Sequence, residues 1–300
     1  MTCNVVAIGG GHGLSATLRA VRRYADDICG VVTVGDDGGS TGRLRRAGWD
    51  VVPGDLRKSL VALAPPESLL AAGLEHRFEA GEVAGHTAGN LLLGAMMREC
   101  GGDLIAVLDA LGEALGTVGR VLPAAVNPVT LLGETSEGWV RGQVEVASTT
   151  NLVRLGFEPA DPMVPGDAVD AIVAADQVIL GPGSLYTSVL AAAAVPGIRR
   201  AVARSTAQVV YVANLAAQEP ESEGYDVSDH VAALAVHGLT PDAVLYDPDR
   251  LAGVDGVSTA VGEQLTEANP WVHDAERLAE ALAGLAGVPL WSEREQAAND

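Results

Sequence analysis

Short apolar runs rich in β-branched residues alternate along the chain with longer segments in which apolar residues recur every three or four positions. The short runs have the length and composition of buried strands, and the longer segments have the period of amphipathic helices. Strands are predicted at residues 4–8, 28–34, 177–180, 209–212 and 243–246. Alternation of this kind is typical of parallel βαβ units, so the pattern predicts an α/β fold.

Helical periodicity begins directly after the first strand, where Leu14, Leu18 and Val21 share one face. Further helices are predicted at residues 56–63, 90–98 and 104–115. Capping residues predict three more helix starts. These are Asp167 for a helix to Ala175, Ser228 for a helix ended by Gly238, and Asn269 with Pro270 for a C-terminal helix over about 270–286.

The stretch over about residues 128–147 differs from this pattern. An apolar run at 129–132 and an alternating run from Trp139 to Val146 flank a polar turn, which predicts an antiparallel β-hairpin. No Pro-, Ser- or Gly-rich linker divides the chain. We therefore expect a single domain over residues 1–300, a doubly wound, Rossmann-like, mostly parallel sheet with the β-hairpin inserted in it.

Charge changes the picture by excluding two classes of partner. The chain has 39 acidic and 19 basic side chains and a formal charge of −20, which argues against binding nucleic acid or docking on an anionic membrane. Residues 1–60 differ from the rest, because eight basic side chains there face six acidic ones. We expect an anionic ligand to bind near this basic start.

The remaining composition indicates a folded cytoplasmic protein without membrane insertion. Apolar residues make up 48% and charged residues 19% of the chain. The first four residues lack a basic signal-peptide region and lead directly into a strand pattern. The three cysteines show neither metal-ligand spacing nor an even number, so we expect buried free thiols.

The first candidate site is the loop Gly9-Gly10-Gly11-His12-Gly13-Leu14, between a predicted strand and a helix. Glycines let the backbone approach a phosphate, and a helix N-terminus offers free N–H groups. Read as Gly11-x-Gly13-x-x-Ala16, the loop loosely matches the dinucleotide fingerprint. A tight turn without a ligand would show the same pattern.

The second candidate follows the second strand and contains the paired acids Asp36 and Asp37 and the basic residue Arg43. Two carboxylates at the carboxyl end of a parallel strand suit Mg²⁺ together with phosphate oxygens. Arg43 can hold a phosphate by bidentate hydrogen bonds. A solvated turn beside a basic helix face is the alternative.

Four further motifs lie at helix entries or strand ends. Arg57 lies in the first turn of a predicted helix, and His86 opens another helix as a general acid–base candidate or as a hydrogen-bonding cap. The segment 181–188 is a second strand-to-helix turn of the phosphate-binding type, with Gly181, Gly183, Ser184 and Thr187 as candidates. Asn214 follows a strand, where its amide can contact a base or a sugar.

In combination, these motifs resemble the CofD-like superfamily and, within it, the YvcK-type branch of gluconeogenesis factors. The resemblance covers residues 5 to about 247 and rests on motifs that occur in the family's order. These are GGGHGLS (9–15), DDGGSTGRLR (36–45), PGDLRKSLVALA (53–64), GHTAGNLLL (85–93), GRVLPA (119–124), GPGSLYTSVL (181–190), VPGI (195–198), YVANL (211–215) and GYDVSDHV (224–231).

The resemblance implies a nucleotide site. The first glycine loop would hold phosphate, Asp36 and Asp37 would be the metal- or acceptor-site acids, and residues 181–187 with Asn214 would line the nucleotide. Three departures stand out: His12 replaces a usual Thr, Ala191–Ala194 replaces a run with Pro-Asn, and residues 216–219 replace a usual Met-Thr-Gln-Pro.

Two functions remain open at this point. The YvcK-type branch implies a regulator that binds a UDP-sugar, above all UDP-N-acetylglucosamine, and links carbon metabolism to cell-wall synthesis and cell shape, with protein partners there. The CofD branch implies a Mg²⁺-dependent transferase that moves a phospholactyl-like group from a nucleoside-diphosphate-linked donor. An NAD-linked enzyme has only the loose fingerprint in its favour. The helical face Leu278–Leu285 fits either the core or a homo-oligomer interface.

Overall fold

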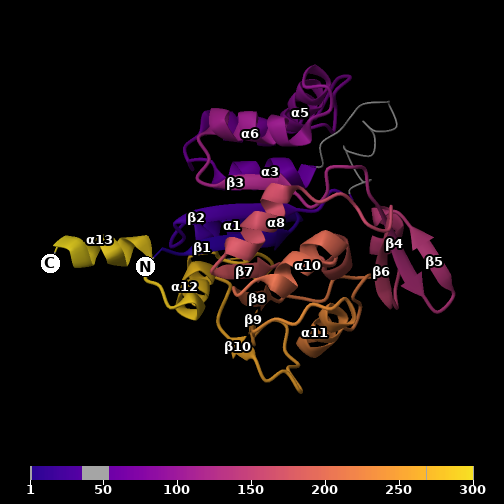
Figure 1. The fold of residues 1–300 in the computed structure, drawn as a ribbon, viewed down its shortest axis with the longest axis vertical. Helices are drawn as coiled ribbons and strands as arrows, with labels where there is room; N and C mark the ends of the chain where they lie inside the picture. Colours follow the sequence, from indigo (N-terminus) through magenta and orange to yellow (C-terminus); the bar gives the residue numbers. More distant parts are fainter. Residues whose placement is uncertain (1, 36–53, 268, 300) are drawn as a thin grey trace.

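A seven-stranded, fully parallel sheet forms the centre of the computed structural model, which describes residues 2–35, 54–267 and 269–299 (Figure 1). The strand order is β10-β9-β8-β7-β1-β2-β3. The strands are β1 (Asn4–Gly9), β2 (Asp27–Val32), β3 (Arg120–Pro123), β7 (Gln177–Leu180), β8 (Gln208–Val212), β9 (Ala243–Tyr246) and β10 (Ala260–Gly262). The chain therefore builds outward from β1 in one direction and later from β7 in the other, which is the doubly wound arrangement predicted from the sequence.

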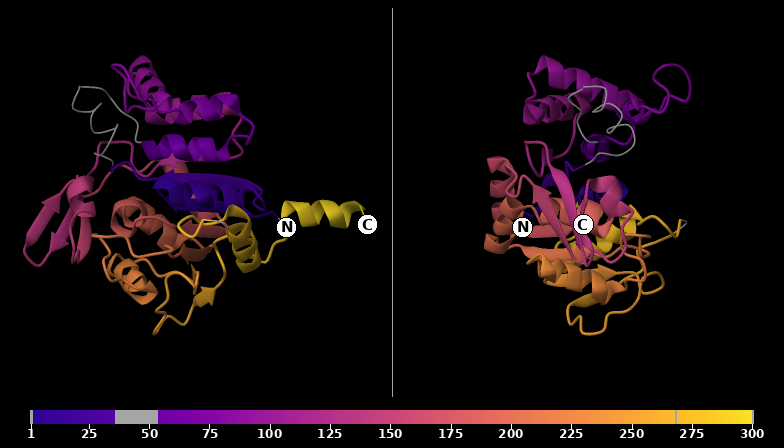
Figure 2. Two further views of the ribbon diagram at one scale, coloured as in Figure 1. Left: turned by 180° about the vertical axis from the view of Figure 1, so that it is seen from behind. Right: turned by 90° about the vertical axis from the view of Figure 1, so that its right-hand side faces the viewer.

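Helices cover both faces of the sheet. One face carries α1 (Gly11–Val21), α3 (Gly54–Leu63) and α12 (Ala275–Ala286), with α4 (Leu69–Glu75), α5 (Ala88–Glu99) and α6 (Leu104–Leu115) stacked beyond α3 (Figure 1). The other face carries α8 (Gly166–Ala174), the π-helix η1 (Leu185–Leu190), α9 (Ala191–Ala193) and α10 (Pro196–Arg204). Helix α11 (Val227–Val236) joins β8 to β9, and α13 (Trp291–Asn299) projects from the body (Figure 2).

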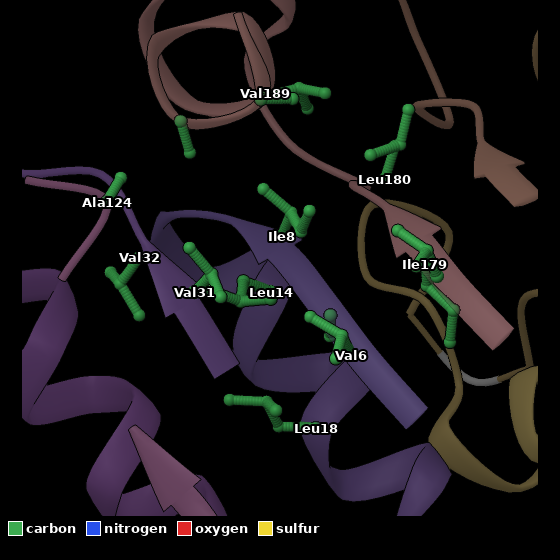
Figure 3. Packing of buried hydrophobic residues seen from close by; sticks show 14 of the residues in the cluster. Val6, Ile8, Leu14, Leu18, Val31, Val32, Ala124, Ile179, Leu180 and Val189 are labelled. Atoms are coloured by element: carbon green, nitrogen blue, oxygen red, sulfur yellow. The ribbon is translucent and has the colours of Figure 1, made fainter. Parts of the chain in front are cut away.

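The core lies where the central strands meet these helices. Val6 and Ile8 of β1, Leu14 of α1 and Val31 of β2 are at most 2% exposed (Figure 3). Because helices cover both faces, the central strands are buried on both sides, which explains their continuous apolar sequences. All five predicted strands are present, and β3 and β10 add to them.

The predicted insertion is a small sheet of its own, and one part of its prediction is wrong. Strands β4 (Thr130–Thr135) and β5 (Gly138–Arg141) form the predicted hairpin, and β6 (Arg154–Glu158) pairs with β4 on the other side. Residues 143–147 were expected to continue the second strand, but they form helix α7 (Gln143–Ala147). Gly142, at φ 100°, ends the strand and lets Val146 turn into the core.

The predicted caps of two helices are also wrong. The N-cap of helix α8 is Pro165, whose side chain has no acceptor, and Asp167 lies in the first turn of the helix, where its carboxylate pairs with Arg120 at 2.5 Å. Helix α11 is capped by Asp226, which forms a capping box with Asp229. The Ser228 hydroxyl donates to Asp226 at 2.6 Å and so supports the cap rather than forming it.

The C-terminal helix begins later than predicted. Asn269 accepts a hydrogen bond from the Trp271 N–H and forms a turn, whereas Asp274 caps α12. Leu278 and Leu282 of α12 are fully buried, so that end of the face belongs to the core. Cys3 and Cys29 are buried as expected, but Cys100 is exposed. Among the described residues, no helix is long and apolar enough to span a membrane.

Candidate functional site

The two halves of the sheet meet at β1 and β7, and the loops that follow these strands pack against each other. A side chain on Gly13 would place its Cβ 2.2 Å from the Pro182 carbonyl oxygen, and one on Gly183 would lie 3.4 Å from the Gly10 oxygen. The Thr17 hydroxyl donates to the Gly181 carbonyl at 2.9 Å. In open α/β sheets this switch point, outside the carboxyl ends of the strands, is where ligands bind.

The first glycine loop, Gly9–Leu14, forms the start of helix α1 and leaves the N–H groups of its first turn accessible. Gly10 is the N-cap in an extended conformation, and no side chain within residues 2–35, 54–267 and 269–299 caps the helix. The first turn itself contains no acidic residue. The first N–H groups of a helix have no intrahelical acceptor. The N–H groups at residues 11–13 and the positive end of the helix dipole are therefore suited to an anion.

His12, Lys58 and Asp55 surround this helix end. The Lys58 Nζ lies 3.2 Å from the Asp55 Oδ1, and the Asp55 Oδ2 lies 2.8 Å from where a Cβ on Gly10 would stand. The Lys58 charge, followed by burial, lowers the pKa of His12, while Asp55 and Glu75 oppose this. The motif at 53–58 drew attention to the cations of this helical turn, but of its residues only Arg57 was predicted to contact the ligand.

Arg57 occupies a buried cluster behind this end of α1. Its side chain is 3% exposed, its Nη1 donates to the Thr87 hydroxyl and to Asn90 Oδ1, and its Nε lies 3.2 Å from Glu75 Oε1, an ion pair without hydrogen-bond geometry. Burial lowers the pKa of Arg57, and Glu75 opposes this. Since Thr87 caps α5, Arg57 ties α3 to α4 and α5.

His86 lies next to this cap but does not form it. The backbone of the loop before α5 is closed by hydrogen bonds from the Phe78 N–H to the His86 carbonyl and from the Gly85 N–H to the Phe78 carbonyl. The Thr87 hydroxyl accepts the capping bond from the Asn90 N–H. The side chain of His86 is half-buried, and its acid–base role stays a prediction.

The second glycine loop differs from the first because a carboxylate of the chain already occupies its helix end. Glu221, 1% exposed, accepts the Thr187 hydroxyl at 2.8 Å and the Tyr186 N–H at 3.3 Å. Burial raises the pKa of Glu221, and these hydrogen bonds oppose the rise. Thr187 was expected to contact the nucleotide, but it is buried and bonded to Glu221; the sequence offered no signal for a partner 34 positions away.

A pocket of about 390 Å³ opens between the second loop and the end of β8. The Asn214 Oδ1 accepts the Gly183 N–H at 2.8 Å, and the Ser184 hydroxyl donates to Gln218 Oε1 at 2.6 Å. Trp271 lines the pocket with a side chain that is 74% exposed, and His273 lies beside it with its Nε2 3.2 Å from the Ala213 carbonyl. Gly13 lines the same pocket and connects it to the first loop.

Three of the candidates lie outside the described residues, namely Asp36, Asp37 and Arg43. Within residues 2–35, 54–267 and 269–299, no three His, Cys, Asp or Glu side chains gather as a metal site would require. The structure thus brings Gly9 to Leu14, Gly181, Gly183, Ser184 and Asn214 together. Arg57 and Thr187 are buried and bonded to other side chains of the chain, and the ligand-binding roles of all these candidates stay predictions.

Comparison with known proteins gives consistent results. The model of the family described as "2-phospho-L-lactate transferase CofD" matches residues 5–288. A Mycobacterium tuberculosis protein named "Putative gluconeogenesis factor" is 45% identical over 84% of this chain and 78% of its own. A protein named "Gluconeogenesis factor" from Halalkalibacterium halodurans is 41% identical over 81% of this chain and 77% of its own. The crystal structure of a UPF0052 family member from Bacillus halodurans superimposes with a TM-score of 0.87 and 34% identity, over 94% of this chain and 99% of that one.

Proposed function

From the membership of this chain in the CofD family we propose that it is a regulatory protein that binds a UDP-sugar. Over most of its length the chain is related to proteins named gluconeogenesis factors. UDP-N-acetylglucosamine is the ligand we propose first. The observation that carries the proposal is the switch point itself, where an uncapped α1 N-terminus lies beside an open pocket.

The diphosphate would bind at the first glycine loop. The N–H groups at residues 11–13 are directed at it by the helix, and Lys58 supplies a cation at the same end. Interaction of an anion with a helix N-terminus contributes about 0.3–2 kcal/mol, and charge-assisted hydrogen bonds about 1.5–3 kcal/mol each. The second loop would not compete for the diphosphate, because Glu221 already neutralises its helix end.

The nucleoside end would occupy the pocket beside Asn214. The side-chain oxygen Oδ1 of Asn214 accepts the Gly183 N–H of the second loop. This leaves the side-chain NH₂ group of Asn214 as a donor to a base or a sugar. The exposed Trp271 ring offers an apolar face on which a base can stack. Gly13 borders both the α1 terminus and the pocket, so one extended ligand can reach from one to the other.

A regulator needs no nucleophile, and the site as described requires none for binding. Occupancy by a nucleotide-sugar would report the state of sugar metabolism to protein partners in cell-wall synthesis and thereby affect cell shape. The names of the relatives mention neither a nucleotide-sugar nor cell-wall synthesis, so this regulatory role follows only if the ligand is a UDP-sugar.

Titration calorimetry with UDP-N-acetylglucosamine, GDP and NAD, each with and without Mg²⁺, tests the proposal. We expect heat with the UDP-sugar. Binding should be about 5- to 150-fold weaker in the Trp271→Ala variant, because stacking of a base is worth about 1–3 kcal/mol. Trp139→Ala, which removes an exposed tryptophan on the inserted sheet, is the matched control. Tight GDP binding without UDP-sugar binding would overturn the proposal.

The second candidate is a Mg²⁺-dependent transferase acting on a nucleoside-diphosphate-linked substrate, and the description of the matching family favours it. It assigns the metal to Asp36 and Asp37 and predicts that Asp36→Asn weakens ligand binding only when Mg²⁺ is present. Asp55 is the described carboxylate nearest the first loop, but its pairing with Lys58 suits a positioning role better than metal binding.

A further inference from the structure

A cavity lined by arginines lies along helix α1, and it shares no lining residue with the pocket beside Asn214. It measures about 560 Å³ and lies between α1, α3, α4 and the start of α12. Three arginines of α1 and its C-terminal turn line it, namely Arg19, Arg22 and Arg23, and Glu75 is the one acidic side chain in its lining. In a chain of net charge −20, three arginines around one cavity need an explanation.

The three arginines differ in how they are held. Among the described residues, Arg19 makes no ion pair. Arg23 pairs with Glu276 at 2.8 Å, with both side chains at least 46% exposed. Arg22 donates from Nη1 to the Ala62 and Ala64 carbonyls at the end of α3. Its Nε and Nη2 groups form no hydrogen bond with the residues that the structure describes.

Acidic neighbours only partly offset these charges. Burial, followed by the Arg19 charge, lowers the pKa of Arg22, and Glu67 opposes this. Glu75 faces the cavity but already forms an ion pair with the buried Arg57. Arg19 and Arg22 therefore repel each other across a partly dehydrated space, and an anion between them would relieve that repulsion.

The rest of the wall is apolar. It consists of small side chains that leave the cavity open, namely Val61, Ala62, Ala64, Pro65, Pro66, Ala71 and Ala72. Cavities of about 300–1,000 Å³ with a few convergent polar groups are typical of small-molecule sites. The volume exceeds what a lone phosphate ion needs, and the apolar wall suits a sugar or carbon skeleton behind a charged group.

We infer that this cavity is a second ligand site, which binds a small phosphorylated molecule with its phosphate between Arg19 and Arg22 and its body on the Ala-Pro wall. The site is separate from the proposed diphosphate position, because Arg19 lies two helical turns from His12 on the same face of α1. The inference does not depend on the proposed function, since none of the cavity residues belongs to the glycine loops.

Hydrogen–deuterium exchange of the full chain with ribose 5-phosphate, and with ribose as the ligand without phosphate, tests this inference. We expect ribose 5-phosphate, but not ribose, to protect residues 19–25 and 66–76. Arg19→Gln should weaken this protection by about tenfold in ligand concentration, the loss expected for one charge-assisted contact. Arg200→Gln, which changes another exposed arginine, on α10, should leave the protection unchanged.

Two results would overturn the inference. One is protection that is confined to residues 9–16, which would place the phosphate at the first glycine loop and support the nucleotide site alone. The other is protection of residues 66–76 that ribose alone produces or that Arg19→Gln does not change. Since Arg19 has no ion pair to lose, this variant should fold, and an unchanged melting temperature verifies that it does.

Discussion

At the scale of single residues, neighbours in the sequence have opposite roles. Arg57 and Lys58 are adjacent in α3, yet Arg57 is buried among Thr87, Asn90 and Glu75, whereas Lys58 pairs with Asp55 beside the first glycine loop. The helical turn separates them, because consecutive residues point about 100° apart around the axis. Closeness in the sequence to a phosphate-type loop therefore does not identify a phosphate ligand, because Arg57 holds helices together instead.

This difference gives a prediction for a pair of variants. Arg57→Lys should lower the free energy of unfolding by about 1–3 kcal/mol, because the lysine cannot bond Thr87, Asn90 and Glu75 together. Its affinity for UDP-N-acetylglucosamine should stay within about twofold once the protein is folded, since the expected loss lies in packing. Lys58→Ala should do the reverse, with affinity lowered and stability nearly unchanged.

Urea unfolding and calorimetry on the same preparations measure both quantities. A stable Arg57→Lys variant with strongly reduced affinity would instead show that Arg57 contacts the phosphate, as the sequence motif alone suggests.

At the scale of elements, the two glycine loops look alike in sequence and differ in what lies at their helix ends. The α1 end is open, whereas the η1 end receives the buried Glu221 carboxylate. Only folding brings Glu221 to Thr187, because α9, α10 and β8 lie between them in the sequence. An internal carboxylate thus takes the place that we propose for an anionic ligand at the first loop.

Glu221→Ala should therefore destabilise the protein by about 1–3 kcal/mol, since it leaves the buried Thr187 hydroxyl and Tyr186 N–H without an acceptor. Glu221→Gln should cost less, because its amide oxygen can still accept one of the two bonds. Glu223→Ala, two residues away on an exposed side chain, should remain within about 0.5 kcal/mol of the wild type. Equal unfolding midpoints for the Ala variants at 221 and 223 would contradict this account.

Elements with strong periodicity could be predicted from the sequence, and their ends could not. The helix at 104–115 and the strands at 177–180 and 243–246 match α6, β7 and β9 residue for residue. The caps at Asp226 and Asp274 were missed because Ser228 and Asn269 are equally good caps by composition, and the choice depends on hydrogen bonds formed in the folded chain. The same limit applies to the site: its glycine loops are visible in the sequence, but Trp271 and Glu221 reach it only through tertiary structure.

At the scale of the whole molecule, basic side chains lie on the helix that follows the central strand β1 and in the turn after it. The two halves of the sheet meet at β1 and β7, and the helix that follows β1 carries His12 and Arg19, with Arg22 and Arg23 in the turn that ends it. Residues 61–300, by contrast, hold 33 of the 39 acidic side chains and only 11 of the 19 basic ones. The doubly wound topology therefore places the region suited to anions beside the switch point, where ligands bind in such folds.

Stability should depend on pH through two buried histidines. Burial lowers the pKa of His230 and of His273 to about 4, from 6.5 in an unfolded chain. Between these values the unfolded state binds more protons, so stability is lost as the pH falls from 6.5 through about 4, by up to about 3 kcal/mol for each residue. Burial raises the pKa of Glu221, which has the opposite effect, because its contribution falls as the pH rises above its unfolded value.

The His230→Gln variant separates the contribution of His230 to the pH dependence of stability from those of His273 and Glu221. Unfolding free energies measured from pH 7 to pH 4 should fall less steeply in the variant than in the wild type. Parallel pH profiles would show that His230 does not titrate in this way.

The crystal structure of the protein with UDP-N-acetylglucosamine is the most direct test of the central claim, that the uncapped end of α1 is the diphosphate site. The account predicts diphosphate oxygens within hydrogen-bond distance of the N–H groups at residues 11–13, with the uracil in the pocket beside Asn214 and Trp271. A diphosphate bound at the second glycine loop in place of the Glu221 carboxylate, or a ligand bound away from both loops, would contradict it.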